Sequence, residues 1–245
     1  MKKTMISALI LLFAHTAYPQ GSVSESLKRH YFNLYEQSLK YDDLPLAIIS
    51  LNNVLVEMPA GPETMKYKDT LSILYFNNKM YLPSFLLANE VYKADTMNYS
   101  ALGRMGECYQ INNDFKSAAD AFEKAAPALK NPFYYYQLAI CQYNLKKPDD
   151  CLANADKVAA DTNSKNYSVV FNMPNNYSQQ VPLKAAALNL KAVLFMDVAK
   201  YVKAKEYLQQ ALAIFPNFDG AKQNVINCDK SLKDLKTKDK TKPKS

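Results

Sequence analysis

The chain has 245 residues, is 49% hydrophobic and contains only five glycines, a composition that favours helices joined by short turns and argues against a sheet protein. This length supports one sizeable core or an elongated stack of helices. The formal net charge of +7 does not indicate nucleic acid as a partner, because Lys2, Lys3 and residues 229–245 carry most of it and leave +1 between them.

The N-terminal stretch MKKTMISALILLFAHTAYPQ predicts a cleaved signal peptide over residues 1–20. Two lysines are followed by the apolar run Met5–Ala14, which is too short to span a bilayer, and then by small and polar residues. Cleavage after Ala17 and cleavage after Gln20 both fit, and the absence of a nearby cysteine argues against a lipoprotein. We expect an exported, periplasmic protein whose short N-terminal segment covers residues 21–27.

Between residues 28 and 218 the sequence repeats one helical pattern. In NNDFKSAADAFEKA, residues 112–125, the small residue Ala118 is followed four and seven positions later by Phe122 and Ala125, which places all three on one helical face. The small residues that open five such segments are Ala47, Ser84, Ala118, Cys151 and Ala204. They are separated by 37, 34, 33 and 53 residues, so three of the four spacings lie close to 34.

A first helix with its own apolar pattern precedes each of these segments, most clearly at Leu102, Met105, Gly106 and Tyr109. This arrangement resembles the tetratricopeptide repeat, whose period is about 34 residues. The resemblance implies an all-α fold, a right-handed α-solenoid of about five helical hairpins. The hairpins are expected near residues 28–61, 65–98, 99–131, 132–160 and 185–218. A capping helix is expected over 219–236.

The Lys-rich end of the chain, residues 237–245, is predicted to be a basic disordered tail. A contact with a membrane surface or an acidic partner is the alternative for this charged end.

Residues 161–184, DTNSKNYSVVFNMPNNYSQQVPLK, form an insertion that fits no regular repeat. One interpretation is a surface loop, with an extended second helix before it. The other is a loop that packs over the inner face of the helices or presents Tyr167, Phe171 and Tyr177 to a partner.

The sequence contains no pattern that indicates catalysis, so we predict that the protein is not an enzyme. The four cysteines, at 108, 141, 151 and 228, have no metal-site spacing, and the chain has two histidines. Buried thiols are the favoured interpretation, and a disulfide between Cys141 and Cys151 is the alternative. No phosphate-binding or hydrolase motif occurs. Neither a cofactor nor a metal is therefore predicted.

The resemblance implies a protein or peptide partner on the concave face formed by the first helices. The predicted contact residues are Phe32, Phe76, Asn77, Arg104, Glu107, Phe133, Tyr136, Ile140, Tyr143, Asn144, Asn189 and Met196. Aromatic and asparagine side chains together suit an apolar segment held by main-chain hydrogen bonds. We therefore expect an exported scaffold, accessory to an envelope assembly. The alternative is a module that binds carbohydrate or an envelope polymer through the exposed Tyr and Asn side chains. The sequence predicts no membrane span and does not indicate an oligomeric state.

Overall fold

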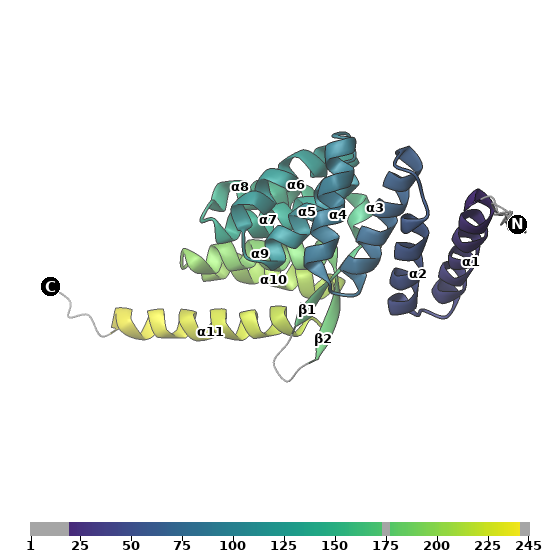
Figure 1. Cartoon of the computed structure of the whole chain (residues 1–245). Coiled ribbons are helices and arrows are strands. Elements are labelled where there is room, and N and C mark those ends of the chain that lie inside the picture. Colours follow the sequence, from purple (N-terminus) through teal and green to yellow (C-terminus); the bar gives the residue numbers. More distant parts are fainter. Residues whose placement is uncertain (1–19, 173–176, 241–245) are drawn as a thin grey trace, which may run out of the picture. The chain divides into compact units, whose positions relative to one another are not determined.

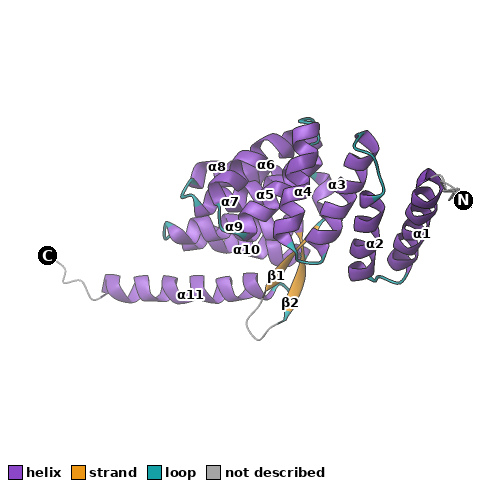
Figure 2. Cartoon of the chain, in the orientation of Figure 1, coloured by secondary structure: helices purple, strands orange, loops and turns teal. Residues whose placement is uncertain are grey.

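The computed structural model describes residues 20–172 and 177–240 (Figure 1). The predicted signal peptide therefore lies outside the described residues, except for Gln20. Within these ranges the chain forms eleven α-helices, one 3-10 helix and two short strands (Figure 2). The prediction of an all-α fold built from consecutive helical hairpins is confirmed, with the two strands as a small addition.

The helices occur as pairs joined by short turns, followed by one unpaired helix. The pairs are α1 (Gln20–Lys40) with α2 (Leu44–Val56), α3 (Pro62–Asn77) with α4 (Tyr81–Ala94), α5 (Tyr99–Ile111) with α6 (Phe115–Leu129), α7 (Pro132–Asn144) with α8 (Pro148–Ala160), and α9 (Leu183–Asp197) with α10 (Tyr201–Ile214). Helix α11 (Asp219–Lys240) follows. Residues 21–27 are thus part of α1, and α11 extends past residue 236 into the predicted tail.

The chain divides into two compact units, residues 1–67 and 68–245. In the first unit the face of α2 that carries the repeat pattern is buried, since Ala47, Leu51 and Val54 are at most 1% exposed. Asp43 caps this helix by accepting a hydrogen bond from the Leu46 amide at 3.0 Å.

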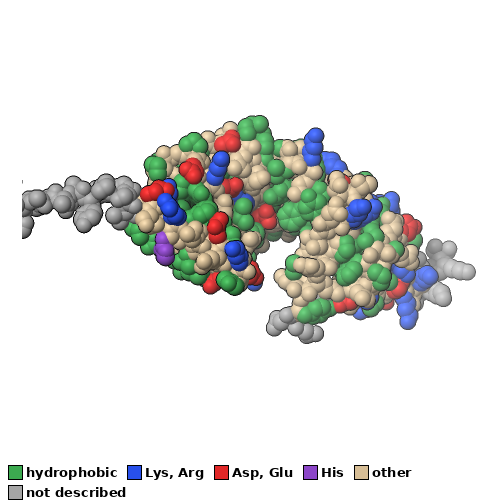
Figure 3. Space-filling view, turned by 90° about the vertical axis from the view of Figure 1, so that its right-hand side faces the viewer, with side chains coloured by type: hydrophobic (Ala, Val, Ile, Leu, Met, Phe, Trp, Pro, Cys, Tyr) green, Lys and Arg blue, Asp and Glu red, His purple; other side chains and the backbone are tan. Residues whose placement is uncertain are grey.

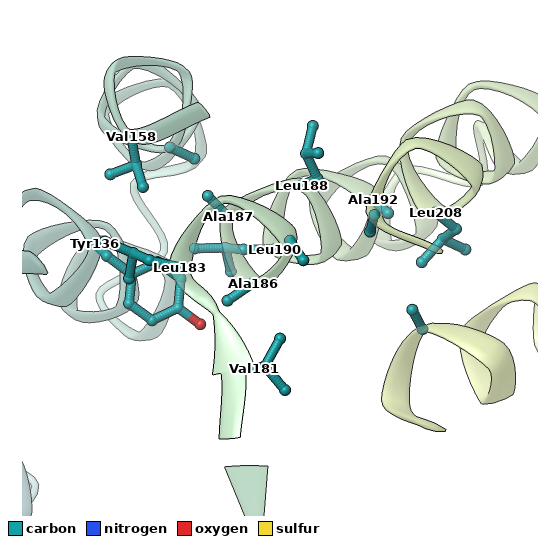
Figure 4. Close-up of a cluster of buried hydrophobic side chains, with 14 of the residues drawn as sticks. Tyr136, Val158, Val181, Leu183, Ala186, Ala187, Leu188, Leu190, Ala192 and Leu208 are labelled. Atoms are coloured by element: carbon teal, nitrogen blue, oxygen red, sulfur yellow. The ribbon is translucent and has the colours of Figure 1, made fainter. Parts of the chain in front are cut away.

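The second unit contains a continuous series of packed helices, with side chains of the repeat pattern at its centre. Ala118, Phe122 and Ala125 of α6 are fully buried. The largest cluster surrounds α9, whose Leu183, Leu188 and other apolar side chains pack with residues of the neighbouring helices (Figure 4). Two short helices cannot bury their apolar faces alone, so the stacking of neighbouring hairpins supplies this core.

The turns within the five helix pairs share one backbone conformation. In each, the residue two positions before the second helix has positive φ, between 56° and 62°: Asp42, Lys79, Asn113, Lys146 and Ala199. The amide of the next residue donates to a carbonyl five positions back, as from Lys200 to Phe195 at 2.9 Å. The positive-φ amide donates three positions back, as from Ala199 to Met196 at 2.9 Å. These paired bonds define a Schellman motif, which satisfies the last carbonyls of each first helix.

Ala199 is the least suited of these five residues to its conformation, because it has a Cβ but no polar side chain that could compensate. A left-handed conformation costs a non-glycine residue about 1–2 kcal/mol. We expect Ala199→Gly to raise the free energy of unfolding by about 0.5–1 kcal/mol, after allowing for the greater freedom of glycine in the unfolded chain. Chemical denaturation tests this. The matched control, Ala213→Gly at an exposed site inside α10, should have the opposite sign, and stabilisation by both substitutions would contradict the explanation.

The described parts of the insertion, residues 161–172 and 177–184, are folded and do not form an irregular loop. They form a 3-10 helix (Thr162–Asn166) and an antiparallel hairpin of β1 (Ser168–Asn172) and β2 (Ser178–Pro182), in which Val169 faces Val181. Burial alternates along β1, with Val169 buried between exposed neighbours. This is the pattern of a sheet with one face packed and the other solvated. In place of an extended second helix, α8 ends at Ala160.

The four cysteines are free thiols with buried side chains, which confirms the favoured interpretation and not the Cys141–Cys151 disulfide. Burial raises the pKa of the Cys141 and Cys151 thiols to about 12, so both are unreactive at neutral pH. Among the described residues, no helix is both long enough and apolar enough to cross a membrane.

Candidate functional site

The β-hairpin of the insertion packs against α7, α9 and the beginning of α11. Val169 and Val181 belong to the same buried cluster as Tyr136 of α7 and Leu183 of α9, and Figure 4 shows Val181 directly before the start of α9. Phe171 lies edge-to-face against Phe218, with ring centroids 4.9 Å apart. The insertion thus covers part of the α7 face that was predicted to bind a partner.

Polar contacts hold β2 to the beginning of α11. The Gln179 side-chain amide donates to the Asn217 carbonyl at 2.7 Å, and its oxygen accepts from the Asp219 main-chain amide at 3.1 Å. The Tyr177 hydroxyl donates to the Asp219 carboxylate. Because Gln179 replaces a capping group at the N-terminus of α11, the hairpin and this helix stabilise each other.

An open groove of about 430 Å³ lies between α7 and β1. Its α7 side consists of Phe133, Tyr136, Gln137 and Ile140, and its other side is the strand segment 168–171. Neither α7 nor the hairpin sequence contains an Asp, Glu, Lys or Arg in its described residues. The groove therefore combines apolar and neutral polar groups, and it suits an uncharged ligand.

The structure brings three of the predicted α7 residues into this groove, but not all of them are available for contact. Phe133 and Ile140 are half-buried and border the open space. Tyr136 is 5% exposed and belongs to the core. Burial raises the pKa of Tyr136 above its usual range. The aromatic ring of Tyr136 therefore packs in the core. Tyr136 was predicted to contact a partner because of its position on α7, but the hairpin covers it.

Arg104 and Glu107 of α5 lie in a mostly buried polar cluster. The Arg104 guanidinium donates to the Asp69 carboxylate and to the Ser72 hydroxyl, both on α3. Arg104 is 7% exposed, so its charge is committed to these partners and is not presented to a ligand.

Burial raises the pKa of the Glu107 carboxyl to about 7, against a smaller opposing effect of Arg104. The pKa of Tyr134, which lies in the same cluster, is raised to about 12, chiefly by burial. Glu107 can therefore carry a proton near neutral pH.

The remaining predicted contact residues are spread over both units. In the first unit Phe32 packs against Tyr67, with ring centroids 5.9 Å apart, and borders a pocket of about 200 Å³. In the second unit Phe76 packs against Tyr81, with ring centroids 5.4 Å apart, and Asn77 is exposed. Phe76 and Asn77 are not among the residues that border the α7 groove.

The last predicted residues lie around α7 and α9. Asn189 is buried and accepts a hydrogen bond from Asn224 at 3.0 Å. Asn144 donates to the Ile140 carbonyl of its own helix at 2.9 Å. Tyr143 is half-buried, and burial together with a hydrogen bond to Asp197 raises its pKa.

The three aromatic residues of the insertion mostly face the protein. Tyr167 is half-buried against the α9 cluster, as is Met196 of α9. Phe171 packs on Phe218, and Tyr177 is 45% exposed with its hydroxyl bonded to Asp219. The interpretation of the insertion as a surface loop does not describe these side chains. Within the other interpretation, packing against the helices describes them better than presentation to a partner.

The sequence pattern places Gln137 on the same inward face of the helix as Phe133, and it borders the groove, but sequence reasoning missed the strand segment 168–171. Part of the signal for the hairpin was present: SVVFN has Val169 and Phe171 at alternate positions, and the sequence between it and SQQVP contains Pro and Asn. This signal was overlooked because helical repeats were expected before and after the insertion.

The described residues contain no group of three or more His, Cys, Asp or Glu side chains that could hold a metal ion. A second apolar pocket, of about 440 Å³, lies between α4 and α5 and includes Leu82, Phe85 and Tyr109. On the face shown in Figure 3, acidic and basic side chains are interspersed with hydrophobic ones.

Comparison with known proteins bears on the fold. The profile of one family, described as "Anaphase-promoting complex, cyclosome, subunit 3", matches residues 77–158. No curated protein sequence matches the chain.

Three solved structures illustrate the similarity in fold. A tetratricopeptide repeat protein from Parabacteroides merdae ATCC 43184 has a TM-score of 0.66 at 12% identity, with 84% of this chain and 74% of that one covered. YrrB, described as a tetratricopeptide repeat protein with an unusual peptide-binding site, has a TM-score of 0.62 at 15% identity, with 83% and 95% covered. MamA from Desulfovibrio magneticus RS-1, from residue 41 to its end, has a TM-score of 0.63 at 13% identity, with 79% and 97% covered.

Proposed function

We propose that this chain, a protein of the tetratricopeptide-repeat fold, is a non-catalytic scaffold that binds a protein or peptide in the groove between α7 and β1. The observation that carries the proposal is the uncharged, partly apolar groove on the face of a first helix. The fold alone does not fix a function. The description of YrrB as having a peptide-binding site is consistent with this use of the fold.

The chemistry of the groove suits an extended peptide. Half-buried Phe133 and Ile140 offer apolar surface, and Gln137 offers a neutral donor and acceptor. Such a mixture suits an extended segment with some apolar side chains. The guanidinium of Arg104 is engaged by Asp69 and Ser72, so capture of a terminal carboxylate by that side chain is not part of the proposal.

Export to the periplasm, and a role as an accessory to an envelope assembly, are parts of the same proposal. They rest on the basic and then apolar composition of residues 1–20. Fractionation of cells that produce the full chain tests export: mature protein that lacks the first 17–20 residues is expected in the periplasmic fraction, and full-length protein in the cytoplasm would contradict it.

Gln137→Glu tests the groove with the smallest change of shape. The substitution places a carboxylate among apolar groups, so binding of an uncharged partner should fall by about tenfold or more, since a desolvated, unpaired charge costs several kcal/mol. Residues 21–245 would be immobilised and exposed to envelope extract, and the specifically bound proteins would be identified and titrated. The matched control is Gln209→Glu, at an exposed site on α10.

The results separate the candidate functions. Proteins held by wild type and by the Gln209→Glu variant, but lost with Gln137→Glu, would support the groove. Proteins held equally by all three would place the interaction elsewhere on the chain. If wild type recovers no protein specifically, the scaffold proposal is overturned, and binding of carbohydrate or an envelope polymer becomes the hypothesis to test.

A further inference from the structure

We infer that the partner segment binds as a third β-strand along the free edge of β1, inside the α7 groove. This inference rests on the proposed function and specifies the mode of binding and the chemistry of the partner. It derives from the hydrogen-bond register of the hairpin, the absence of charge around its edge, and the position of that edge beside α7.

The register shows which main-chain groups of β1 are free. The Leu183 amide donates to the Tyr167 carbonyl at 2.9 Å. In an antiparallel pair, hydrogen-bonded and non-hydrogen-bonded residue pairs alternate. The bonded pairs are then Val169–Val181 and Phe171–Gln179, and the pairs between them are Ser168–Pro182, Val170–Gln180 and Asn172–Ser178. The position of Pro182 agrees, because proline has no amide hydrogen to donate.

The main-chain N–H and C=O groups of Ser168, Val170 and Asn172 therefore point away from β2. Within the described chain, these groups form no main-chain hydrogen bond with another element. The segment 168–171 borders the groove together with α7, and Figure 2 shows the two strands (orange) beside the helices. An extended chain in the groove would find donors and acceptors along one side.

This edge lacks the usual protection against strand pairing. Free edges are normally guarded by lysine, proline or a bulge, whereas β1 reads SVVFN, and its register with β2 is regular over all five pairs. The opposite edge, on β2, is limited by Pro182. Since neither β1 nor α7 contains a charged residue, the edge suits an uncharged segment.

The geometry also indicates the pattern of the partner. Successive side chains of a strand point to opposite faces, so alternate residues of the bound segment would lie against Phe133 and Ile140 and the others toward solvent. We therefore infer an extended partner segment of about five residues, uncharged, with apolar residues at alternate positions. Main-chain bonds would supply affinity and the α7 side would select side chains.

Val170→Pro tests this mode without breaking the hairpin. The Val170 amide makes no bond to β2 in this register, so proline there removes a donor from the free edge alone. Gln180→Pro is the matched control, because it removes the corresponding outward amide from the opposite edge. Circular dichroism and the denaturation midpoint would establish that both variants are folded. A Val170→Lys variant, which keeps the amide and adds an edge charge, covers the case in which a proline variant does not fold.

The probe is a random dodecapeptide library selected on immobilised chain 21–245. We expect enriched peptides that are uncharged and apolar at alternate positions, with affinity lowered about tenfold or more by Val170→Pro or Val170→Lys and kept in Gln180→Pro. Hydrogen exchange gives a second readout. On adding an enriched peptide, the amides of Ser168, Val170 and Asn172 should become protected, whereas those of Val169 and Phe171 should be protected already.

Each other outcome overturns the inference. Peptides that bind Val170→Pro as well as wild type, or no enriched peptide, would exclude the β1 edge. A wild-type dimer that Val170→Pro converts to monomer would show that a second copy occupies the edge. If wild type and Val170→Pro capture the same envelope proteins and Gln137→Glu does not, the scaffold proposal stands and only strand addition fails. If wild type captures none, the scaffold proposal itself fails.

Discussion

Glu107→Gln is expected to stabilise the protein at pH 8 and to leave its stability nearly unchanged at pH 4. Burial raises the pKa of Glu107 to about 7 from an ordinary value of 4.5. Between these two pH values the folded protein keeps a proton that the unfolded chain has lost. Stability is therefore lost as the pH rises through this window, and the loss is complete above the folded pKa.

Glutamine has the shape of the protonated acid and cannot ionise, so it removes this penalty. The expected gain in the free energy of unfolding at pH 8 is on the order of 3 kcal/mol, because the pKa rises from 4.5 to about 7 and each unit corresponds to about 1.4 kcal/mol. Urea denaturation of wild type and variant at pH 4, 6 and 8 measures it.

The matched control is Glu123→Gln, at an exposed site on α6, where the change should stay within about 0.5 kcal/mol at every pH. If Glu107→Gln instead destabilises the protein at pH 8, the attraction between Arg104 and an ionised Glu107 outweighs the cost of burying the carboxylate. That result would assign Glu107 to the Arg104 ion-pair network.

Gly106→Ala is expected to lower the free energy of unfolding by about 1–3 kcal/mol through overpacking. A Cβ at Gly106 would lie 2.7 Å from Cε1 of Phe122 and 3.0 Å from two further ring atoms. Phe122 is fully buried, in a cluster with Ala118, Leu138 and Cys141. The ring cannot move aside without disturbing the contact between α5 and α6 and the packing of α7.

Phe122→Leu provides the test of mechanism, because it shortens the group that the new methyl would meet. On its own it should cost about 1 kcal/mol or more. Combined with Gly106→Ala it should cost clearly less than the sum of the two single changes. Gly61→Ala is the control, since a Cβ there would have no atom within 4 Å. Additive single and double effects would show that Gly106 matters for a reason other than the Phe122 contact.

The helical hairpins could be predicted from the sequence because each depends on short-range pattern. Ala118, Phe122 and Ala125 occur within eight residues and were expected on one buried face, where the structure places them. The site was less accessible to prediction. Arg104 is neutralised by Asp69, 35 positions away, and Asn189 is bonded to Asn224, also 35 positions away. A local sequence pattern does not reveal pairings over such distances. Arg104 and Asn189 were therefore predicted to contact a partner, although their side chains are bonded within the chain.

The insertion was harder to predict for a different reason. In SVVFN the alternation is limited to Val169 and Phe171, and SQQVP contains a single β-branched residue, Val181. Both segments also contain Asn, Ser or Gln, which occur in loops. Their folding depends on the apolar faces of α7 and α9, against which Val169 and Val181 are buried. A two-stranded hairpin has little stability alone, and only the packed structure shows that these helices provide the missing support.

The contact between Gln179 and the beginning of α11 has a consequence for how the chain unfolds. In a linear repeat array each repeat touches only its neighbours, so terminal repeats can melt one at a time. Here Gln179 bonds to Asn217 and Asp219, 38 and 40 positions later, and the helices α9 and α10 lie between these positions. The contact closes a loop around them, so that α11 cannot detach without breaking bonds to the hairpin. The end of the array, from α9 onward, should therefore melt cooperatively as one block rather than fray helix by helix.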